Sequence, residues 1–191
     1  RRRGDVPDID LGPLLAGAVT MLSGPGCPVC VTPDGYIDAA IALGRGRGAL
    51  LASFGDMLRV PGKSSSLEKE KGTGLEVRVM YSPLDAVTLA TATPDREVVF
   101  LGVGFETTAP AIGGAIRTAA ERGVRNFSVL SSVRTIPEAI GVLAADPEVR
   151  IEGFLCPAHV SVVIGTDAYR PVAQRYGIPC VVAGFEPLDI L

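Results

Sequence analysis

The sequence contains no tryptophan and a single histidine, and only 5% of its 191 residues are aromatic. No apolar run approaches the roughly 20 residues that cross a bilayer, so no membrane-spanning helix is predicted. The net charge is -3, and no basic stretch with interleaved aromatic residues is present. A nucleic-acid backbone or a membrane is therefore not an expected partner of this chain.

Cysteine is also scarce. Four cysteines in a chain of this length do not make a disulfide scaffold. Three arginines at residues 1–3 and an apolar stretch at 14–22 resemble a short signal peptide. Asp5, Asp8 and Asp10 lie between them, however, and no small-residue cleavage site follows. The expected location is the cytoplasm, where cysteines act as reactive thiols or metal ligands.

Apolar, β-rich runs alternate with helix-length segments, and 47% of all residues are hydrophobic. Near-continuous apolar runs are typical of parallel strands that are covered on both faces. The expected strands are residues 18–22, 49–53, 75–81, 97–103, 126–131, 151–155 and 178–183. The expected helices are residues 33–43 with Thr32 as N-cap, 83–92, 109–122, 137–145 and 166–176.

This alternation predicts an α/β fold with two Rossmann-like, doubly wound domains and mainly parallel sheets. The first domain is expected over residues 1–92 and carries the CPVC motif. The second is expected over residues 93–191 and carries the GFETT and CPAHVS motifs. The polar, Gly/Ser-rich segment 61–74 is predicted to be a loop with one helical turn.

The strongest candidate site is the sequence GPGCPVC at residues 24–30. Cys27 and Cys30 are spaced to form a disulfide or to hold one metal ion, and the positive end of the following helix favours thiolate. Gly24, Pro25 and Gly26 would let the backbone approach a ligand closely. The alternative is that both cysteines are small buried side chains in a tight loop.

His159 lies directly after an expected strand, where an imidazole can relay protons or orient a ligand. A lone histidine is otherwise often just a satisfied polar group. Cys27, Cys30, Cys156 and His159 together make a Cys3His zinc set, but 125 positions separate Cys30 from Cys156 (156 minus 30, less one). Compact zinc motifs keep their pairs within roughly 20 residues, so zinc is disfavoured.

Glu106, Thr107 and Thr108 follow another expected strand and are predicted to cap the next helix. Glu106 is equally well explained as a proton acceptor, and the sequence leaves both roles open. The glycines at positions 102 and 104 lack the third glycine of a dinucleotide fingerprint. Cys180, inside an expected strand, is most simply a core residue.

Six blocks of sequence, in order and spread over most of the chain, resemble the HypD family of nickel-iron hydrogenase maturation proteins. They are residues 22–33 (LSGPGCPVCVTP), 54–62 (FGDMLRVPG), 79–86 (VMYSPLDA), 102–110 (GVGFETTAP), 153–165 (GFLCPAHVSVVIG) and 181–191 (VVAGFEPLDIL). The combination is far more specific than a single CxxC motif.

The resemblance implies a scaffold rather than a conventional turnover enzyme. Such proteins pair with the small chaperone HypC and hold an iron atom while two cyanides, supplied through HypE, and one carbon monoxide are attached. The finished group then passes to the hydrogenase large-subunit precursor. The resemblance assigns a redox-active dithiol to Cys27 and Cys30, and places His159 in the same cleft, which Glu106, Thr107 and Thr108 are expected to line.

The chain also departs from the family pattern. The Cys-Gly-Thr-His motif whose cysteine is thought to ligate the iron is expected upstream of Arg1, and the cysteines of a four-iron four-sulfur cluster are expected downstream of Leu191. Ala158 stands where glycine is typical. Two rival functions remain at this stage: a thioredoxin-type thiol-disulfide oxidoreductase, and a small-ligand binding module whose cysteines are structural.

Overall fold

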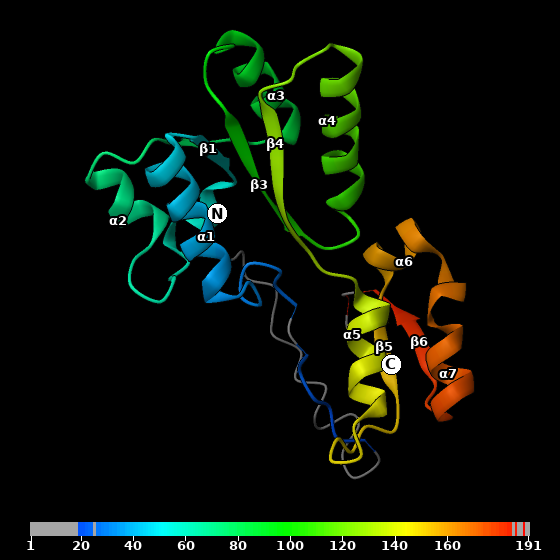
Figure 1. The fold of residues 1–191 in the computed structure, drawn as a ribbon. Helices are drawn as coiled ribbons and strands as arrows, with labels where there is room; N and C mark the ends of the chain where they lie inside the picture. Colours follow the sequence, from blue (N-terminus) through cyan, green and yellow to red (C-terminus); the bar gives the residue numbers. More distant parts are fainter. Residues whose placement is uncertain (1–18, 25, 185, 187–188, 190–191) are drawn as a thin grey trace. The chain divides into compact units, whose positions relative to one another are not determined.

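The structure is a computed structural model that describes residues 19–24, 26–184, 186 and 189. The chain divides into two compact units (Figure 1). The larger spans Cys27–Val142, and the smaller combines Leu143–Leu191 with Arg1–Gly26. The division falls within α5 (Ile136–Ala145).

The larger unit is built on a four-stranded parallel sheet. Its strands are β1 (Leu50–Ser53), β2 (Val77–Val79), β3 (Val98–Gly104) and β4 (Phe127–Val133). They lie in the order β2-β1-β3-β4, and every pairing is parallel. All seven residues of β3 are buried, as expected for a parallel strand with neighbours on both sides and helices over both faces.

Helices cover both faces of this sheet. They are α1 (Asp34–Arg47), the 3-10 helix η1 (Gly55–Arg59), α2 (Leu67–Gly72), α3 (Pro83–Ala92) and α4 (Ala109–Glu121). Figure 1 shows α3 and α4 side by side along the sheet, and their buried alanines and valines pack together and against β3. The opposite face is covered by α1, η1 and α2.

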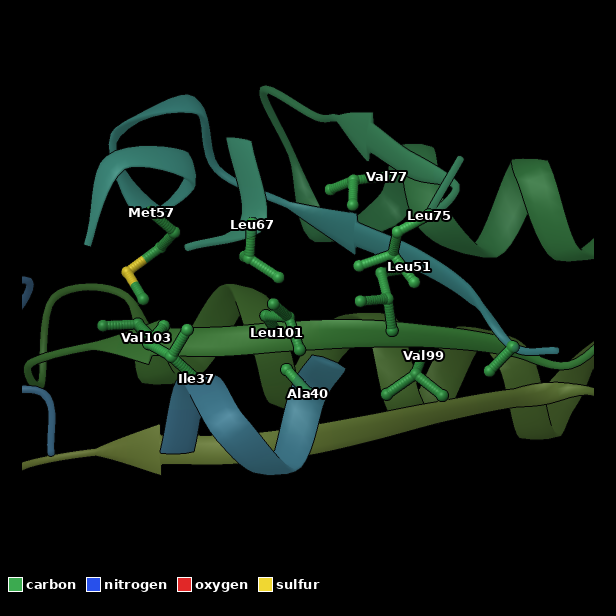
Figure 2. Packing of buried hydrophobic residues seen from close by; sticks show 11 residues of the cluster. Ile37, Ala40, Leu51, Met57, Leu67, Leu75, Val77, Val99, Leu101 and Val103 are labelled. Carbon is green, nitrogen blue, oxygen red and sulfur yellow. The ribbon is translucent and has the colours of Figure 1, made fainter. Parts of the chain in front are cut away.

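The core follows from the alternation of side chains along the strands. Leu101 and Val103 of β3 point to one face, where Figure 2 shows them beside Ile37 and Ala40 of α1. Phe100 points to the other face and meets the ring of Phe54 edge-on at a centroid distance of 5.4 Å. The result is a three-layer α/β/α unit with a doubly wound parallel sheet, as the sequence predicts.

The smaller unit contains a second parallel sheet of two strands. Its elements are β5 (Phe154–Pro157), α6 (Ala158–Ile164), the 3-10 helix η2 (Thr166–Tyr169), α7 (Arg170–Tyr176) and β6 (Cys180–Ala183). The hydroxyl of Ser161 donates to the carbonyl of Pro157, and Tyr169 lies within hydrogen-bond distance of the same hydroxyl, 3.2 Å away. In the described part of both units, no helix is long and apolar enough to cross a membrane.

Most expected elements are confirmed, and the α3 bounds agree at both ends with the prediction of 83–92. The reason is local: Ser82 accepts a hydrogen bond from the Leu84 N–H, Asp85 accepts one from the Ser82 N–H, and Pro83 opens the helix. The expected loop over 61–74 contains one short helix, α2.

Three local predictions are wrong. Residues 19–22 form no strand and are exposed, because a strand needs a hydrogen-bonding neighbour as well as apolar side chains; Ala18 lies outside the described residues. Thr32 does not cap α1, whose N-cap is Pro33. The sequence prediction also missed α6, where β-branched residues disfavour a helix intrinsically.

The division into units differs from the expected boundary between residues 92 and 93. β3 lies after that boundary but pairs with β1, which lies before it. The side-chain amide of Asn126 further ties the two segments by donating to the carbonyls of Ala90, Thr93 and Arg96 at 2.8–2.9 Å. Sheet pairing therefore keeps residues on both sides of position 92 in one unit.

Candidate functional site

The strand order determines where a ligand is most readily bound in the larger unit. The chain leaves β1 toward β2 on one side and leaves β3 toward β4 on the other, so the order reverses between β1 and β3. In open α/β sheets, ligands bind beyond the carboxyl ends of the strands at such a reversal. Residues that directly follow Ser53 and Gly104 are thus the natural candidates.

Cys27 and Cys30 face each other in a turn over residues 27–30, which we call the dithiol turn. The Cys30 N–H donates to the carbonyl of Cys27 at 3.1 Å and lies 3.4 Å from its sulfur. The Thr32 hydroxyl donates to the carbonyl of Pro28 at 3.0 Å and so stabilises the turn. The structure thus brings the two predicted thiols together in the reduced form.

The two thiols differ in acidity. Hydrogen bonds from the Cys30 thiol and the Cys30 N–H lower the pKa of Cys27, and the Val29 N–H adds to this effect. The hydrogen bond to Cys27 raises the pKa of Cys30, and its slight burial and the charge of Cys27 act in the same direction. Cys27 is therefore the thiol that ionises first, which makes it the candidate nucleophile or ligand of the pair.

Asp56 is a site residue that the sequence interpretation missed. It lies in η1, shortly after β1, and its charge raises the pKa of Cys27, as the smallest of the contributions to that pKa. Val29 of the dithiol turn packs against the buried cluster that contains Met57 and Val103. Ile37 of α1 lies beside Val103 near the carboxyl end of β3 (Figure 2), so the dithiol turn, which shortly precedes α1, lies on the carboxyl-end side of the sheet.

The glycines before the dithiol turn are exposed. A Cβ atom at Gly24 or Gly26 would meet nothing within 4 Å, and neither residue has a positive φ. The described fold does not itself require glycine at either position, so their role in admitting a ligand stays a prediction. Pro25 lies outside the described residues.

Glu106 follows β3 and is only 6% exposed, whereas Thr107 is exposed and Thr108 is half-buried. The prediction that these residues cap the next helix is wrong in part. Thr108 is the N-cap of α4 but its side chain makes no capping hydrogen bond. The Glu106 carboxylate accepts instead from the Ile136 N–H at 2.6 Å, and so caps α5, a helix distant in sequence.

The other carboxylate oxygen of Glu106 distinguishes this residue from an ordinary cap. Oε2 is buried and, among the described residues, has no hydrogen-bond partner. Burying a carboxylate oxygen without a donor is costly, and in native proteins such atoms are uncommon. Oε2 is therefore available to a proton or a ligand donor at the carboxyl end of β3.

His159 lies in the first turn of α6, in the smaller unit, and its side chain is exposed. It follows β5 directly, as predicted. Cys156 is buried in β5 with 2% of its surface exposed. Among the described residues no three His, Cys, Asp or Glu side chains gather as a metal site.

The larger unit thus defines a class: an α/β protein with a solvent-accessible dithiol on the carboxyl-end side of a doubly wound parallel sheet. A family model described as "HypD: Hydrogenase formation hypA family" matches residues 5–191. The chain belongs to this family, as the sequence blocks indicate.

Relatives agree with this assignment. The chain is 48% identical to the hydrogenase maturation factor HypD of Azotobacter vinelandii over 195 residues, which is 99% of this chain and 50% of the relative. It is 46% identical to the HypD of Escherichia coli K12 over 181 residues, or 95% of this chain and 48% of the relative. The chain spans about half the length of the curated relatives it matches.

Proposed function

We propose that this chain acts in nickel-iron hydrogenase maturation, as part of a scaffold on which iron receives two cyanides and one carbon monoxide. The observation that carries the proposal is the dithiol turn: two reduced, accessible thiols in contact, with the pKa of Cys27 lowered and that of Cys30 raised. Membership of the HypD family supports a role in hydrogenase maturation, and the use of this dithiol there is part of the proposal.

The dithiol suits iron that carries strong-field ligands. A Cys27 thiolate is a soft ligand and a nucleophile, and thiolates bind such iron well. When the pair closes to a disulfide it releases two electrons and two protons, which a bound group or a partner's disulfide accepts. In this proposal iron is the cargo, bound transiently, with further ligands supplied from outside the described residues.

Glu106 and His159 have supporting roles in the proposal. The unpartnered Oε2 of Glu106 accepts a proton or a donor from the bound group, while Oε1 remains on α5. His159 acts as a proton relay or orienting group. Gly24, Pro25, Gly26, Thr107 and Thr108 keep their predicted role as ligand-contacting residues as part of this proposal.

The proposed partners are a HypC-like small chaperone, a HypE-like cyanide donor and, through the chaperone, the hydrogenase large-subunit precursor. The proposed location is the cytoplasm, where the dithiol is kept reduced. A four-iron four-sulfur cluster belongs to the full-length family in this proposal. The described residues do not fit one, because they bring together no three potential ligands, so no step is assigned to it.

The test is replacement of Cys27 in the native gene, with hydrogenase activity of the cells as readout. Cys27→Ser removes the thiolate while preserving the size of the side chain, and we expect loss of hydrogenase activity with normal protein abundance. Thr88→Ser, a similarly small change at an exposed position of α3, is the control and should retain activity. Full activity in Cys27→Ser cells would rule out the dithiol role.

The thioredoxin-type alternative is tested on the purified chain. A disulfide oxidoreductase reduces protein disulfides repeatedly when an external reductant is supplied, and the asymmetric acidity of Cys27 and Cys30 is compatible with this chemistry. A maturation scaffold requires no such turnover. Sustained reduction of insulin disulfides, abolished by Cys27→Ser, would favour the oxidoreductase.

A further inference from the structure

Two further cysteines meet in the smaller unit. The parallel pairing of β5 with β6 sets Phe154 opposite Cys180 and Cys156 opposite Val182. Because side chains alternate along a strand, Cys156 and Cys180 point to the same face of the two-stranded sheet, one pleat apart. The Cys180 side chain also influences the Cys156 thiol electrostatically, as expected for neighbours on that face.

We propose that Cys156 and Cys180 form a second redox-active thiol pair, which reacts with a low-molecular-weight disulfide such as oxidised glutathione and closes to a disulfide linking β5 to β6. This pair is separate from Cys27 and Cys30. Both of its thiols are free in the structure, so the site is present in its reduced form.

The environments of the two thiols assign their roles. Cys180 is partly accessible, and its sulfur lies 3.8 Å from the carbonyl of Ile178. Cys156 is 2% exposed, and burial, followed by the charge and hydrogen bond of Cys180, raises the pKa of Cys156 to about 12. Cys180 is therefore the attacking thiol and Cys156 the resolving one.

The reaction balances in two exchanges. The Cys180 thiolate attacks one sulfur of oxidised glutathione, forming a mixed disulfide and releasing one glutathione thiolate, which takes up the proton that Cys180 lost. Once Cys180 is bound in the mixed disulfide its charge no longer opposes ionisation of Cys156. Cys156 then attacks the Cys180 sulfur, the second glutathione leaves with the Cys156 proton, and the protein loses two electrons to the two glutathiones.

The product would close a covalent loop over residues 156–180. This loop contains α6, η2 and α7, together with His159. Crosslinking a loop of this length restricts the unfolded chain and stabilises the folded unit. Oxidation would thus link β5, which leads into α6 and His159, covalently to β6. The thiols of the dithiol turn would react with an oxidant independently of this pair.

The experiment uses the intact chain with Cys27→Ser and Cys30→Ser, so that only the second pair can react. After exposure to oxidised glutathione, free thiols are trapped with an alkylating reagent and peptides are identified by mass spectrometry. We expect loss of both remaining thiols, a crosslinked Cys156–Cys180 peptide, and a rise in Tm of roughly 5 °C or more. Reduction should reverse all three.

A matched variant identifies the order of attack. With Cys156→Ala added, the reaction should stop at glutathione attached to Cys180; with Cys180→Ala added instead, Cys156 should stay unmodified. Circular dichroism establishes that each variant is folded, and either variant alone suffices if the other does not fold.

Two outcomes in the chain that retains both Cys156 and Cys180 would overturn the proposal. One is that both thiols still react with the alkylating reagent after denaturation, and the other is that glutathione stays attached to Cys180 while Cys156 remains a free thiol. Because Cys27 and Cys30 are absent, that failure leaves their proposed role intact.

Discussion

At the residue scale, the acidity of Cys27 depends mainly on one neighbouring side chain. The Cys30 thiol is the largest cause of the lowered Cys27 pKa, and the Cys30 N–H comes next. A replacement of Cys30 can remove the first cause and leave the second in place. The chemistry of the dithiol turn is therefore separable into a side-chain and a backbone contribution.

We predict that Cys30→Ala raises the pKa of Cys27, although not to that of a free thiol, because the backbone N–H at position 30 remains. The measurement is the rate of Cys27 alkylation by iodoacetamide between about pH 6 and pH 10, a window that brackets ordinary thiol pKa values. In the unchanged protein the rate should reach its plateau at lower pH. An unaltered profile in Cys30→Ala would mean that the backbone alone sets the acidity.

Glu106 has two separable oxygens, one that caps α5 and one without a partner. Glu106→Ala should destabilise the protein by about 1–2 kcal/mol, since the cap is lost. Glu106→Gln keeps an acceptor for the Ile136 N–H and should cost no more than about 0.5 kcal/mol, because the amide oxygen still caps α5. Urea unfolding measures both.

Hydrogenase activity in cells that carry the same two variants then distinguishes capping from chemistry. If the carboxylate accepts a proton, Glu106→Gln loses activity while remaining stable. Normal activity in Glu106→Gln cells would reduce the role of Glu106 to capping α5.

At the scale of elements, the strand end that carries the candidate site is closely packed. A Cβ atom at Gly104 would overlap the side chain of Thr108, so the turn from β3 into α4 fits only with glycine there. The backbone of this strand end must also pair with β4, because the Arg134 N–H donates to the Gly104 carbonyl at 2.9 Å.

We predict that Gly104→Ala lowers the free energy of unfolding by about 1–3 kcal/mol, the usual cost of overpacking a close contact. Gly113→Ala is the matched control: the position is exposed in α4, and an added Cβ meets nothing within 4 Å. That variant should gain roughly 0.5–1 kcal/mol, since alanine favours a helix. Equal stability of the two variants in urea would contradict the packing argument.

At the scale of the whole molecule, the division into compact units has a direct consequence for truncation. A fragment of residues 1–92 retains β1 and β2 but loses β3, which pairs with β1 and carries the largest share of the buried strand residues. A fragment of residues 27–142 retains the complete four-stranded sheet and the dithiol turn.

We therefore expect the fragment 27–142 to unfold cooperatively and the fragment 1–92 to remain largely unfolded. Amide proton dispersion in NMR spectra and urea unfolding followed by circular dichroism distinguish the two. A well-dispersed spectrum for 1–92 would instead support the domain boundary expected from the sequence.

The sequence by itself determined the features that depend on local pattern. Buried parallel strands are apolar throughout, which revealed β1 and β3, and the Ser82 capping box with Pro83 located α3 at both ends. The Cys27-x-x-Cys30 spacing and the six ordered blocks led to the right family, since motifs of this kind are contiguous in the chain.

Only the tertiary structure decided which distant segments meet. It exposed Cys27 to the charge of Asp56, assigned the Glu106 cap to α5, and set Cys156 and Cys180 on one face of the β5–β6 sheet. It also left residues 19–22 without a partner strand and joined segments on both sides of position 92 in one sheet. Strand order and register arise from packing between segments far apart in sequence, and local propensity carries no record of those contacts.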